Sequence, residues 1–191
     1  MKIVLASKSP RRKEVLEKHG YDVIIDVSNV DENSAKKKDV KELVMELAKL
    51  KAQTVAKRHK DTIIVAADTL VYFERKELGQ PKDAHEAEEM IRRLIGKTHE
   101  VYSGICIINT SNSEVMQDFD LSKVKLKKVS DETLREYIAS GQYKGKAGAY
   151  NINDPEFENF IDNVKGSYFN VMGLPIEKVE KMIDKAVAKV K

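Results

Sequence analysis

One acidic residue, Asp68, stands inside an apolar segment, residues 62–71 (TIIVAADTLV), which is typical of a strand covered on both faces. A carboxylate in such a place costs free energy unless it is paired, protonated or bound to a metal. Glu32 lies in an acidic loop at 29–33. With Asp68 it could complete an oxygen-ligand site, because Mg²⁺ or Mn²⁺ is held by one or two carboxylates together with phosphates and waters. The alternative is that Asp68 caps a neighbouring loop and Glu32 is a solvated surface residue.

A second candidate lies near the N-terminus, where a short strand ends and residues 7–12 (SKSPRR) enter a helix. The exposed backbone N–H groups, the hydroxyls of Ser7 and Ser9 and the guanidinium groups of Arg11 and Arg12 suit a polyphosphate. The alternative is a capped helix with two solvated arginines, although cations in a first helical turn oppose the helix dipole.

Two lysines are further candidates for phosphate contacts, and each has a structural alternative. Lys51 is near the end of an apolar helix, where a cation also complements the helix dipole. Lys82 follows a Gly-Gln-Pro turn and precedes a helix cap, so it could also be an ordinary loop lysine.

Other motifs give no evidence of a functional site. Residues 96–98 (GKT) lack the first glycine of a phosphate loop. Cys106 is the only cysteine, which excludes a disulfide within the chain.

The elements that must position these residues follow from apolar periodicity and from helix caps. Strand and helix signals alternate along the chain, which predicts an α/β fold with a mixed sheet in one unit, 1–191. Residues 142–153 are Gly-rich and irregular. Strands are expected at 2–6, 21–26, 62–71, 100–108 and 115–126, and helices are expected to begin at Ser9–Pro10, Asp39, Asp83, Ser130 and Pro175.

Charge and hydropathy narrow the class of partner. The chain has 34 Lys and Arg against 31 Asp and Glu, and its net charge of +3 gives no argument that it wraps a nucleic acid. No segment approaches the roughly 20 apolar residues of a membrane span, and the N-terminal apolar run is too short for a signal peptide. We therefore expect a cytoplasmic protein with no membrane partner, in which any ligand binding depends on local charge. A homodimer stays open.

Several segments in fixed order resemble the Maf family of nucleotide pyrophosphatases. The resemblance implies an elongated mixed sheet flanked by helices, with two lobes around a central cleft, as in inosine triphosphate pyrophosphatases. It also implies a metal-dependent attack of water on the α-phosphorus, with pyrophosphate leaving. The matching segments are 6–12 (ASKSPRR), 30–32 (VDE), 48–52 (AKLKA), 66–69 (AADT), 79–83 (GQPKD), 146–150 (KAGAY) and 166–175 (GSYFNVMGLP).

The resemblance also implies roles for single residues. By position, Asp68 is similar to the general base and metal-associated carboxylate of the family, and Glu32 to a second acid of the metal site. Arg12 and Lys51 are similar to phosphate contacts.

Base preference divides the family into branches. Arg11 and Thr69 match the branch that prefers dTTP and UTP, whereas Asn153 stands where that branch has Gln. Two further departures are Gln80, where the family usually has Lys, and residues 154–158 (DPEFE), which replace a Gly-rich loop.

We therefore predict hydrolysis of dTTP, UTP and modified pyrimidine nucleotides to a monophosphate and pyrophosphate, with Mg²⁺ or Mn²⁺ as cofactor. Two alternatives stay open: a house-cleaning pyrophosphatase that also accepts purine or non-standard nucleotides, and a non-catalytic nucleotide-binding regulator of cell division. The predicted catalytic residues are Asp68, Lys51 and Glu32, the predicted metal ligands are Glu32 and Asp68, and the predicted substrate contacts are Ser7, Ser9, Arg11, Arg12, Thr69, Lys82 and Asn153.

Overall fold

The computed structural model describes residues 1–32, 35 and 39–188. The strands are β1 (Lys2–Leu5), β2 (Asp22–Ile25), β3 (Ile63–Phe73), β4 (Lys76–Leu78), β5 (Thr98–Asn109), β6 (Glu114–Leu126) and β7 (Ile161–Lys165). The helices are α1 (Pro10–Lys18), α2 (Val40–Ala56), α3 (Ala84–Leu94), α4 (Asp131–Ser140), α5 (Tyr168–Val171) and α6 (Ile176–Ala188), with short 3-10 helices η2 (Ala147–Ala149) and η3 (Pro155–Phe160).

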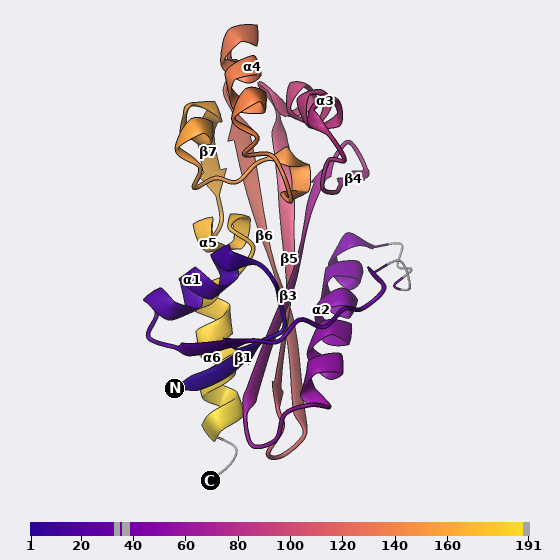
Figure 1. Cartoon of the computed structure of the whole chain (residues 1–191), viewed down its shortest axis with the longest axis vertical. Coiled ribbons are helices and arrows are strands. Elements are labelled where there is room, and N and C mark those ends of the chain that lie inside the picture. Colours follow the sequence, from indigo (N-terminus) through magenta and orange to yellow (C-terminus); the bar gives the residue numbers. More distant parts are fainter. Residues whose placement is uncertain (33–34, 36–38, 189–191) are drawn as a thin grey trace. The chain divides into compact units, whose positions relative to one another are not determined.

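Within the described residues the strands form one seven-stranded sheet, in the order β2-β1-β3-β5-β6-β7 with β4 paired to β3 (Figure 1). Strand β1 is parallel to both β2 and β3. Strand β4 is antiparallel to β3, and β7 is antiparallel to β6. The predicted α/β fold with a mixed sheet is therefore confirmed.

The chain divides into two compact units. Unit 1 consists of Met1–Asp68, Ser103–Asp120 and Gly173–Lys191, and unit 2 of Thr69–Tyr102 and Leu121–Met172. The long strands β3, β5 and β6 contribute residues to both units. The predicted single functional domain with a central cleft stays a prediction.

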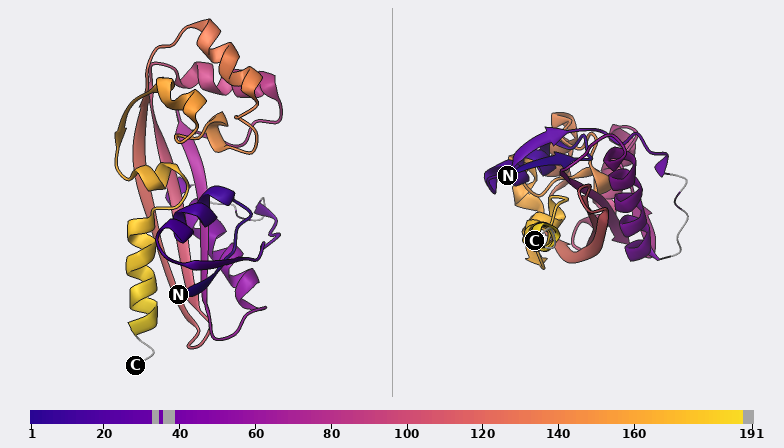
Figure 2. Two further views of the ribbon diagram at one scale, coloured as in Figure 1. Left: turned by 60° about the vertical axis from the view of Figure 1, so that its left-hand side comes forward. Right: turned by 90° about the horizontal axis from the view of Figure 1, so that it is seen from below.

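In unit 1 the long helix α2 packs its apolar face on the sheet. Its buried Ala48, Ala52 and Val55 belong to one cluster with residues of β1, β3 and β5. A side chain at Gly104 would place its Cβ 2.2 Å from the carbonyl oxygen of Val44, so the missing side chain lets β5 approach α2 closely. Helices α2 and α6 lie on opposite sides of the strands of this unit (Figure 2). This packing determines which way the polar residues of α2 can point.

Unit 2 has a core rich in aromatic residues. The ring of Phe157 stacks on Tyr150 and on Phe160, with ring centroids 4.5 Å apart in both cases. The hydroxyl of the buried Tyr137 donates to the carbonyl oxygen of Ala149 at 3.0 Å. These contacts attach the irregular segment that follows α4 to the core, although the segment has little regular structure of its own.

Four of the predicted helix starts are confirmed by side-chain caps. Ser9, Asp39, Asp83 and Ser130 each accept a hydrogen bond from a backbone N–H in the first turn of their helix. Strands β4 and β7 and the short helices were not predicted, because these short segments depend on their neighbours rather than on a periodic pattern of their own. The last predicted helix, 175–190, is present as α6, and its residues beyond 188 lie outside the described residues.

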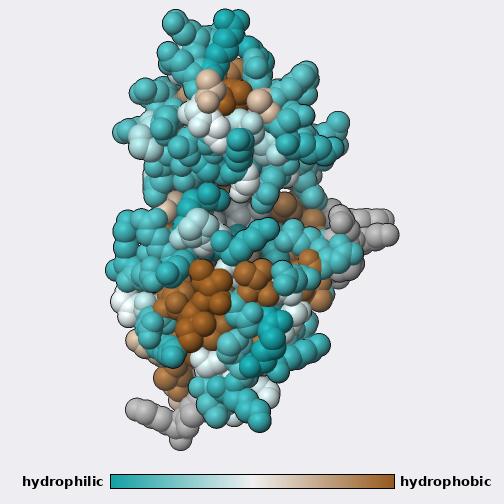
Figure 3. Space-filling model, viewed as in Figure 1, coloured by the Kyte–Doolittle hydropathy of each residue, from teal (hydrophilic) through white to brown (hydrophobic). Residues whose placement is uncertain are grey.

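The surface of unit 1 carries some apolar area. Strand β2 ends the sheet order, and the side chains of Ile24 and Ile25 are exposed on it. Figure 3 shows apolar residues gathered on this unit. In the part of the chain that the structure describes, no helix is both long and apolar enough to cross a membrane. A homodimer, which the sequence leaves open, stays open.

Candidate active site

The carboxylate of Asp68 is buried near the middle of β3, following five buried residues, Ile63 to Ala67. Its Oδ1 atom accepts a hydrogen bond from the ammonium nitrogen Nζ of Lys51 at 2.5 Å. Only 9% of the Asp68 side chain and 11% of the Lys51 side chain are exposed. The carboxylate is therefore paired with a cation, as its burial requires, and the alternative of a loop cap is wrong.

Lys51 comes from α2, whose apolar residues face the sheet and direct this side chain to β3. The prediction that Lys51 lies at a helix end is wrong, because α2 continues to Ala56. The helix dipole acts mainly within the last turn, so it does not explain a lysine at this position. The buried ion pair with Asp68 explains why a lysine stands at this position.

Glu32 adds a third ionised group to this pair. Its Oε1 atom lies 2.7 Å from Nζ of Lys51, and 60% of its side chain is exposed. One ammonium group thus contacts two carboxylates, one buried in the sheet and one open to solvent. We call Glu32, Lys51 and Asp68 the acid–lysine cluster.

The acid–lysine cluster bears on the predicted metal site. Among the described residues there is no group of three or more His, Cys, Asp or Glu side chains that could hold a metal ion. A hard cation such as Mg²⁺ needs only one or two carboxylates, because phosphates and waters supply its other ligands. Glu32 and Asp68 are such a pair, and both already contact a cation, the Lys51 ammonium. The residues present therefore fit the predicted ion.

The side chain of Arg12 is turned into unit 1. Its Nε donates to the carbonyl oxygen of Gly173 at 2.8 Å, and its Nη1 donates to the carbonyl oxygen of Ala67 at 2.8 Å and to Oγ of Ser7 at 3.1 Å. Burial lowers the pKa of Arg12, the charge of Asp68 opposes this change, and the charge of Arg11 adds to it. Arg12 thus joins the start of α1 to β3, directly beside Asp68, and the alternative of a solvated arginine is wrong.

Ser7, Ser9 and Arg11 surround Arg12 at the start of α1. The Oγ of Ser7 also accepts from the backbone N–H of Ser9 at 3.2 Å, and Oγ of Ser9 accepts from the backbone N–H of Arg12 at 3.5 Å. Arg11 is half-buried in the first turn. Both serines therefore hold backbone groups of this turn in the structure, and their predicted contact with a phosphate stays a prediction.

Three of the predicted substrate contacts, Thr69, Lys82 and Asn153, belong to unit 2. Thr69 follows Asp68 in β3 and is half-buried. Lys82 is exposed, and its backbone N–H donates to Oε2 of Glu86 at 2.7 Å, which helps to start α3. The structure therefore supports a capping role for the backbone of Lys82 and leaves a role for its ammonium group as a prediction.

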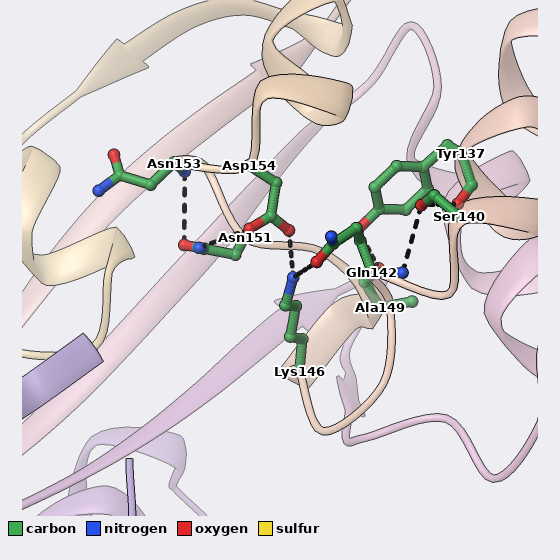
Figure 4. A network of polar contacts seen from close by, with 8 residues as sticks. All are labelled: Tyr137, Ser140, Gln142, Lys146, Ala149, Asn151, Asn153 and Asp154. Carbon is green, nitrogen blue, oxygen red and sulfur yellow. Dashed lines mark hydrogen bonds and ion pairs between the residues drawn. The ribbon is translucent and has the colours of Figure 1, made fainter. Parts of the chain in front are cut away.

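Asn153 lies in a turn held by a polar network (Figure 4). Lys146 forms an ion pair with Asp154, and Asn151 donates from Nδ2 to Oδ1 of Asp154 at 2.9 Å. The backbone N–H of Asn153 donates to Oδ1 of Asn151 at 3.4 Å. The Asn153 side chain points away from the ion pair (Figure 4).

The Lys146–Asp154 pair was missed by the sequence analysis. Its side chains are only 8% and 12% exposed, which is as low as the exposure of Lys51 and Asp68. Both residues lie in an irregular segment, where no periodicity indicates which side chains are buried. The sequence contains one indication of this pair: Asp154 belongs to the segment 154–158, which departs from the Gly-rich loop expected from the family resemblance.

A family model and several named proteins each match nearly the whole chain. A family model described as Maf-like protein matches residues 2–186. A Clostridium acetobutylicum protein named dTTP/UTP pyrophosphatase is 42% identical, covering 96% of this chain and 96% of that protein. Proteins of the same name from Pyrococcus furiosus and Thermoanaerobacter pseudethanolicus are 41% and 46% identical, covering 96% and 94% of this chain and 94% and 93% of theirs.

The solved structure of the Staphylococcus aureus Ham1 protein is a more distant match. It aligns with a TM-score of 0.46 and 16% identity, covering 66% of this chain and 72% of that chain.

Proposed function

The chain belongs to the Maf family, and on this premise we propose that it hydrolyses nucleoside triphosphates, chiefly dTTP and UTP, to the monophosphate and pyrophosphate. Relatives that carry the name dTTP/UTP pyrophosphatase support this proposal, since they match almost end to end. The single observation that carries it is the acid–lysine cluster, in which Lys51 Nζ lies 2.5 Å from Asp68 and 2.7 Å from Glu32.

We assign the role of general base to Asp68. Its Oδ1 accepts from Lys51, so Oδ2 takes the proton of the attacking water. The water oxygen forms a bond to the α-phosphorus while the bond to the bridging oxygen breaks, and the electron pair of that bond leaves with pyrophosphate. Burial among apolar residues favours this role, because a fixed base in a poorly hydrated strand needs little reorganisation.

Positively charged side chains of unit 1 offset the negative charge of the phosphates in this proposal. Lys51 and Arg12 are the proposed phosphate contacts, and Ser7 and Ser9 present hydroxyls and backbone N–H groups at the start of α1. A divalent cation, Mg²⁺ or Mn²⁺, would stabilise charge on the phosphate oxygens as a Lewis acid, held by Glu32 and Asp68.

The preference for pyrimidine bases is assigned to Arg11, Thr69 and Asn153, with Lys82 as a further substrate contact. Arg11 and Thr69 are of the residue types expected for this preference, and Asn153 retains the side-chain amide of the expected Gln. We further propose that residues 1–191 act as one functional domain in the cytoplasm on free nucleotides, with no nucleic acid required.

The experiment is a panel of canonical and modified triphosphates, assayed for pyrophosphate with Mg²⁺, with Mn²⁺ and with a chelator. We expect kcat/KM for UTP and dTTP to exceed that for ATP and GTP, and no turnover in the chelator. Triphosphate binding without pyrophosphate release would instead indicate a non-catalytic regulator. Faster hydrolysis of GTP or ITP than of UTP would indicate a broad house-cleaning enzyme.

A further inference from the structure

The backbone around Asn153 is fixed independently of its side chain. The ion pair of Lys146 with Asp154 and the hydrogen bonds of Asn151 hold the turn 151–154. Asn153 itself is exposed at this turn. A residue that is held by its backbone and has a solvent-facing amide is suited to contact a ligand, provided that the amide has a defined orientation.

That orientation is defined by Tyr168 and Met172. The hydroxyl of Tyr168 donates to Oδ1 of Asn153 at 2.6 Å, and Nδ2 of Asn153 donates to Sδ of Met172 at 3.4 Å. A distance of 2.6 Å is ordinary for an O–H···O bond and short for an N–H···O bond, so the oxygen of the amide faces Tyr168. A thioether sulfur can only accept, so the amide nitrogen must face Met172. Both neighbours favour the same orientation.

Tyr168 remains a hydrogen-bond donor at neutral pH. Burial raises the pKa of its hydroxyl, and the charge of Glu158 raises it further. The hydroxyl also lies 3.3 Å from the carbonyl oxygen of Ile152, so it has acceptors on the backbone as well as on the side chain of this turn. The amide oxygen of Asn153 therefore already accepts one hydrogen bond, whereas within the described residues only one of the two amide hydrogens has an acceptor.

From this geometry we propose that Tyr168 is a positioning residue for base recognition, which orients the Asn153 amide so that it presents an N–H donor to the base. This inference rests on the proposed function and adds to it a physical reason for the choice between bases. A fixed donor favours a base edge with a carbonyl group, as in uracil and thymine, and disfavours an edge with an amino group, as in cytosine and adenine. An amide free to turn over would present either a donor or an acceptor and would lose this selectivity.

UTP and CTP are the sharpest pair of substrates, because their bases differ only at position 4, carbonyl against amino, and at the neighbouring N3, which carries a hydrogen in uracil and none in cytosine. We expect Tyr168→Phe to lower the ratio of kcat/KM for UTP to that for CTP by about 3- to 10-fold, the range for one lost hydrogen bond. The ratio cancels effects on phosphates and metal, which both substrates share. The matched control is Tyr102→Phe, which removes another hydroxyl of unit 2, one that donates to Glu100 at 3.0 Å, and which should leave the ratio unchanged.

A double-mutant cycle separates orientation from packing. In Asn153→Asp the two oxygens are equivalent acceptors, so we expect the ratio to move toward CTP. Adding Tyr168→Phe to Asn153→Asp should then change the ratio much less than it does in the wild-type background. An equal effect of Tyr168→Phe in both backgrounds would overturn the inference, because an altered ring packing does not depend on which atoms residue 153 presents.

The two proposals fail differently. If the wild-type chain releases no pyrophosphate from any triphosphate, the proposed function fails, and the inference fails with it. If the wild type hydrolyses UTP and the ratio of UTP to CTP is the same in Tyr168→Phe, the pyrophosphatase proposal stands and only the role of Tyr168 is lost.

Discussion

Among the residues that the structure describes, each unit has a buried lysine–aspartate pair, and the two pairs differ in their surroundings. Lys51–Asp68 in unit 1 has side chains 11% and 9% exposed, and Lys146–Asp154 in unit 2 has side chains 8% and 12% exposed. The first pair is joined by a further carboxylate, Glu32, which is 60% exposed. The second is joined by neutral amides, since Asn151 donates to Asp154 and Lys146 donates to Gln142 at 3.5 Å.

Burial and pairing alone therefore do not distinguish Asp68, the proposed catalytic carboxylate, from Asp154. In unit 2 the neutral amides satisfy the pair without adding charge, so it is closed and suited to holding a turn. In unit 1 a solvent-exposed carboxylate contacts the same ammonium, so an incoming cation or phosphate can compete for these groups. The following predictions test this comparison, from the largest expected effect to the smallest.

Asp68→Asn should abolish turnover while leaving the fold and triphosphate binding largely intact. Removal of the proposed general base and metal ligand should lower kcat by at least about 10²-fold. The rate of pyrophosphate release from UTP by the purified variant measures the effect. Asp154→Asn is the matched control, because it removes a carboxylate of similar burial from the other pair. Near-normal turnover of Asp68→Asn would remove Asp68 from the mechanism.

Asp154→Asn should affect stability more than Asp68→Asn does. It leaves the Lys146 ammonium buried without its counter-ion, which costs about 3 kcal/mol. The midpoint of urea unfolding should fall, whereas kcat should fall less than in Asp68→Asn. The double variant Lys146→Met with Asp154→Leu should recover most of the lost stability, because apolar residues of similar size can replace a buried ion pair. An unchanged unfolding midpoint in Asp154→Asn would show that this pair does not hold the turn.

His99 should make the stability of the protein depend on pH through unit 2. Burial lowers the pKa of His99 to about 4, and its Nε2 lies 2.6 Å from the hydroxyl of Tyr150. The unfolded chain binds this proton near pH 6.5, so the folded state loses stability as the pH falls from about 6.5 toward 4. Between pH 7 and pH 5 the loss is about 2 kcal/mol.

Urea unfolding at several pH values checks this loss. His99→Gln should flatten the pH dependence relative to the wild type over this range. His85→Gln is the control, because His85 is exposed and interaction with its own backbone and with Glu89 raises its pKa rather than lowering it. Equal slopes for the wild type and His99→Gln would mean that His99 does not remain neutral in the folded state.

Arg12→Ala and Lys51→Ala should weaken triphosphate binding about tenfold each, or about 1.4 kcal/mol. The loss should become smaller at high salt, because the proposed role of both residues is to offset phosphate charge. Titration with a non-hydrolysable UTP analogue at two ionic strengths measures it. Lys13→Ala, which removes a half-exposed lysine of α1, should bind as the wild type does. Unchanged affinity in both site variants would leave only structural roles for Arg12 and Lys51.

Local features of the chain were predictable because their physics is local. A cap joins residues within one turn, so Ser9, Asp39, Asp83 and Ser130 were readable as helix starts. The strand around Asp68 was readable from its apolar run, and the cost of a buried carboxylate indicated that this residue needs a partner.

The partners themselves were decided only by the tertiary structure. Lys51 reaches Asp68 because α2 packs its apolar face on β3, a contact that sequence spacing does not express. Sequence spacing therefore leaves open the capping alternative for Asp68 and the dipole alternative for Lys51, and the packing of α2 decides against both. Strand β7 forms by pairing with β6, and its five residues have too little pattern to predict a strand alone.

The turn that carries Asn153 is the clearest case. By itself the sequence determined which residue types are present there: a lysine, an acid and several amides in a Gly-rich segment. The tertiary structure decided that Lys146 pairs with Asp154 and that Tyr168 holds the Asn153 amide. In a segment without repeating backbone geometry, spacing along the chain does not determine which side chains meet, and the fold of the surrounding core does.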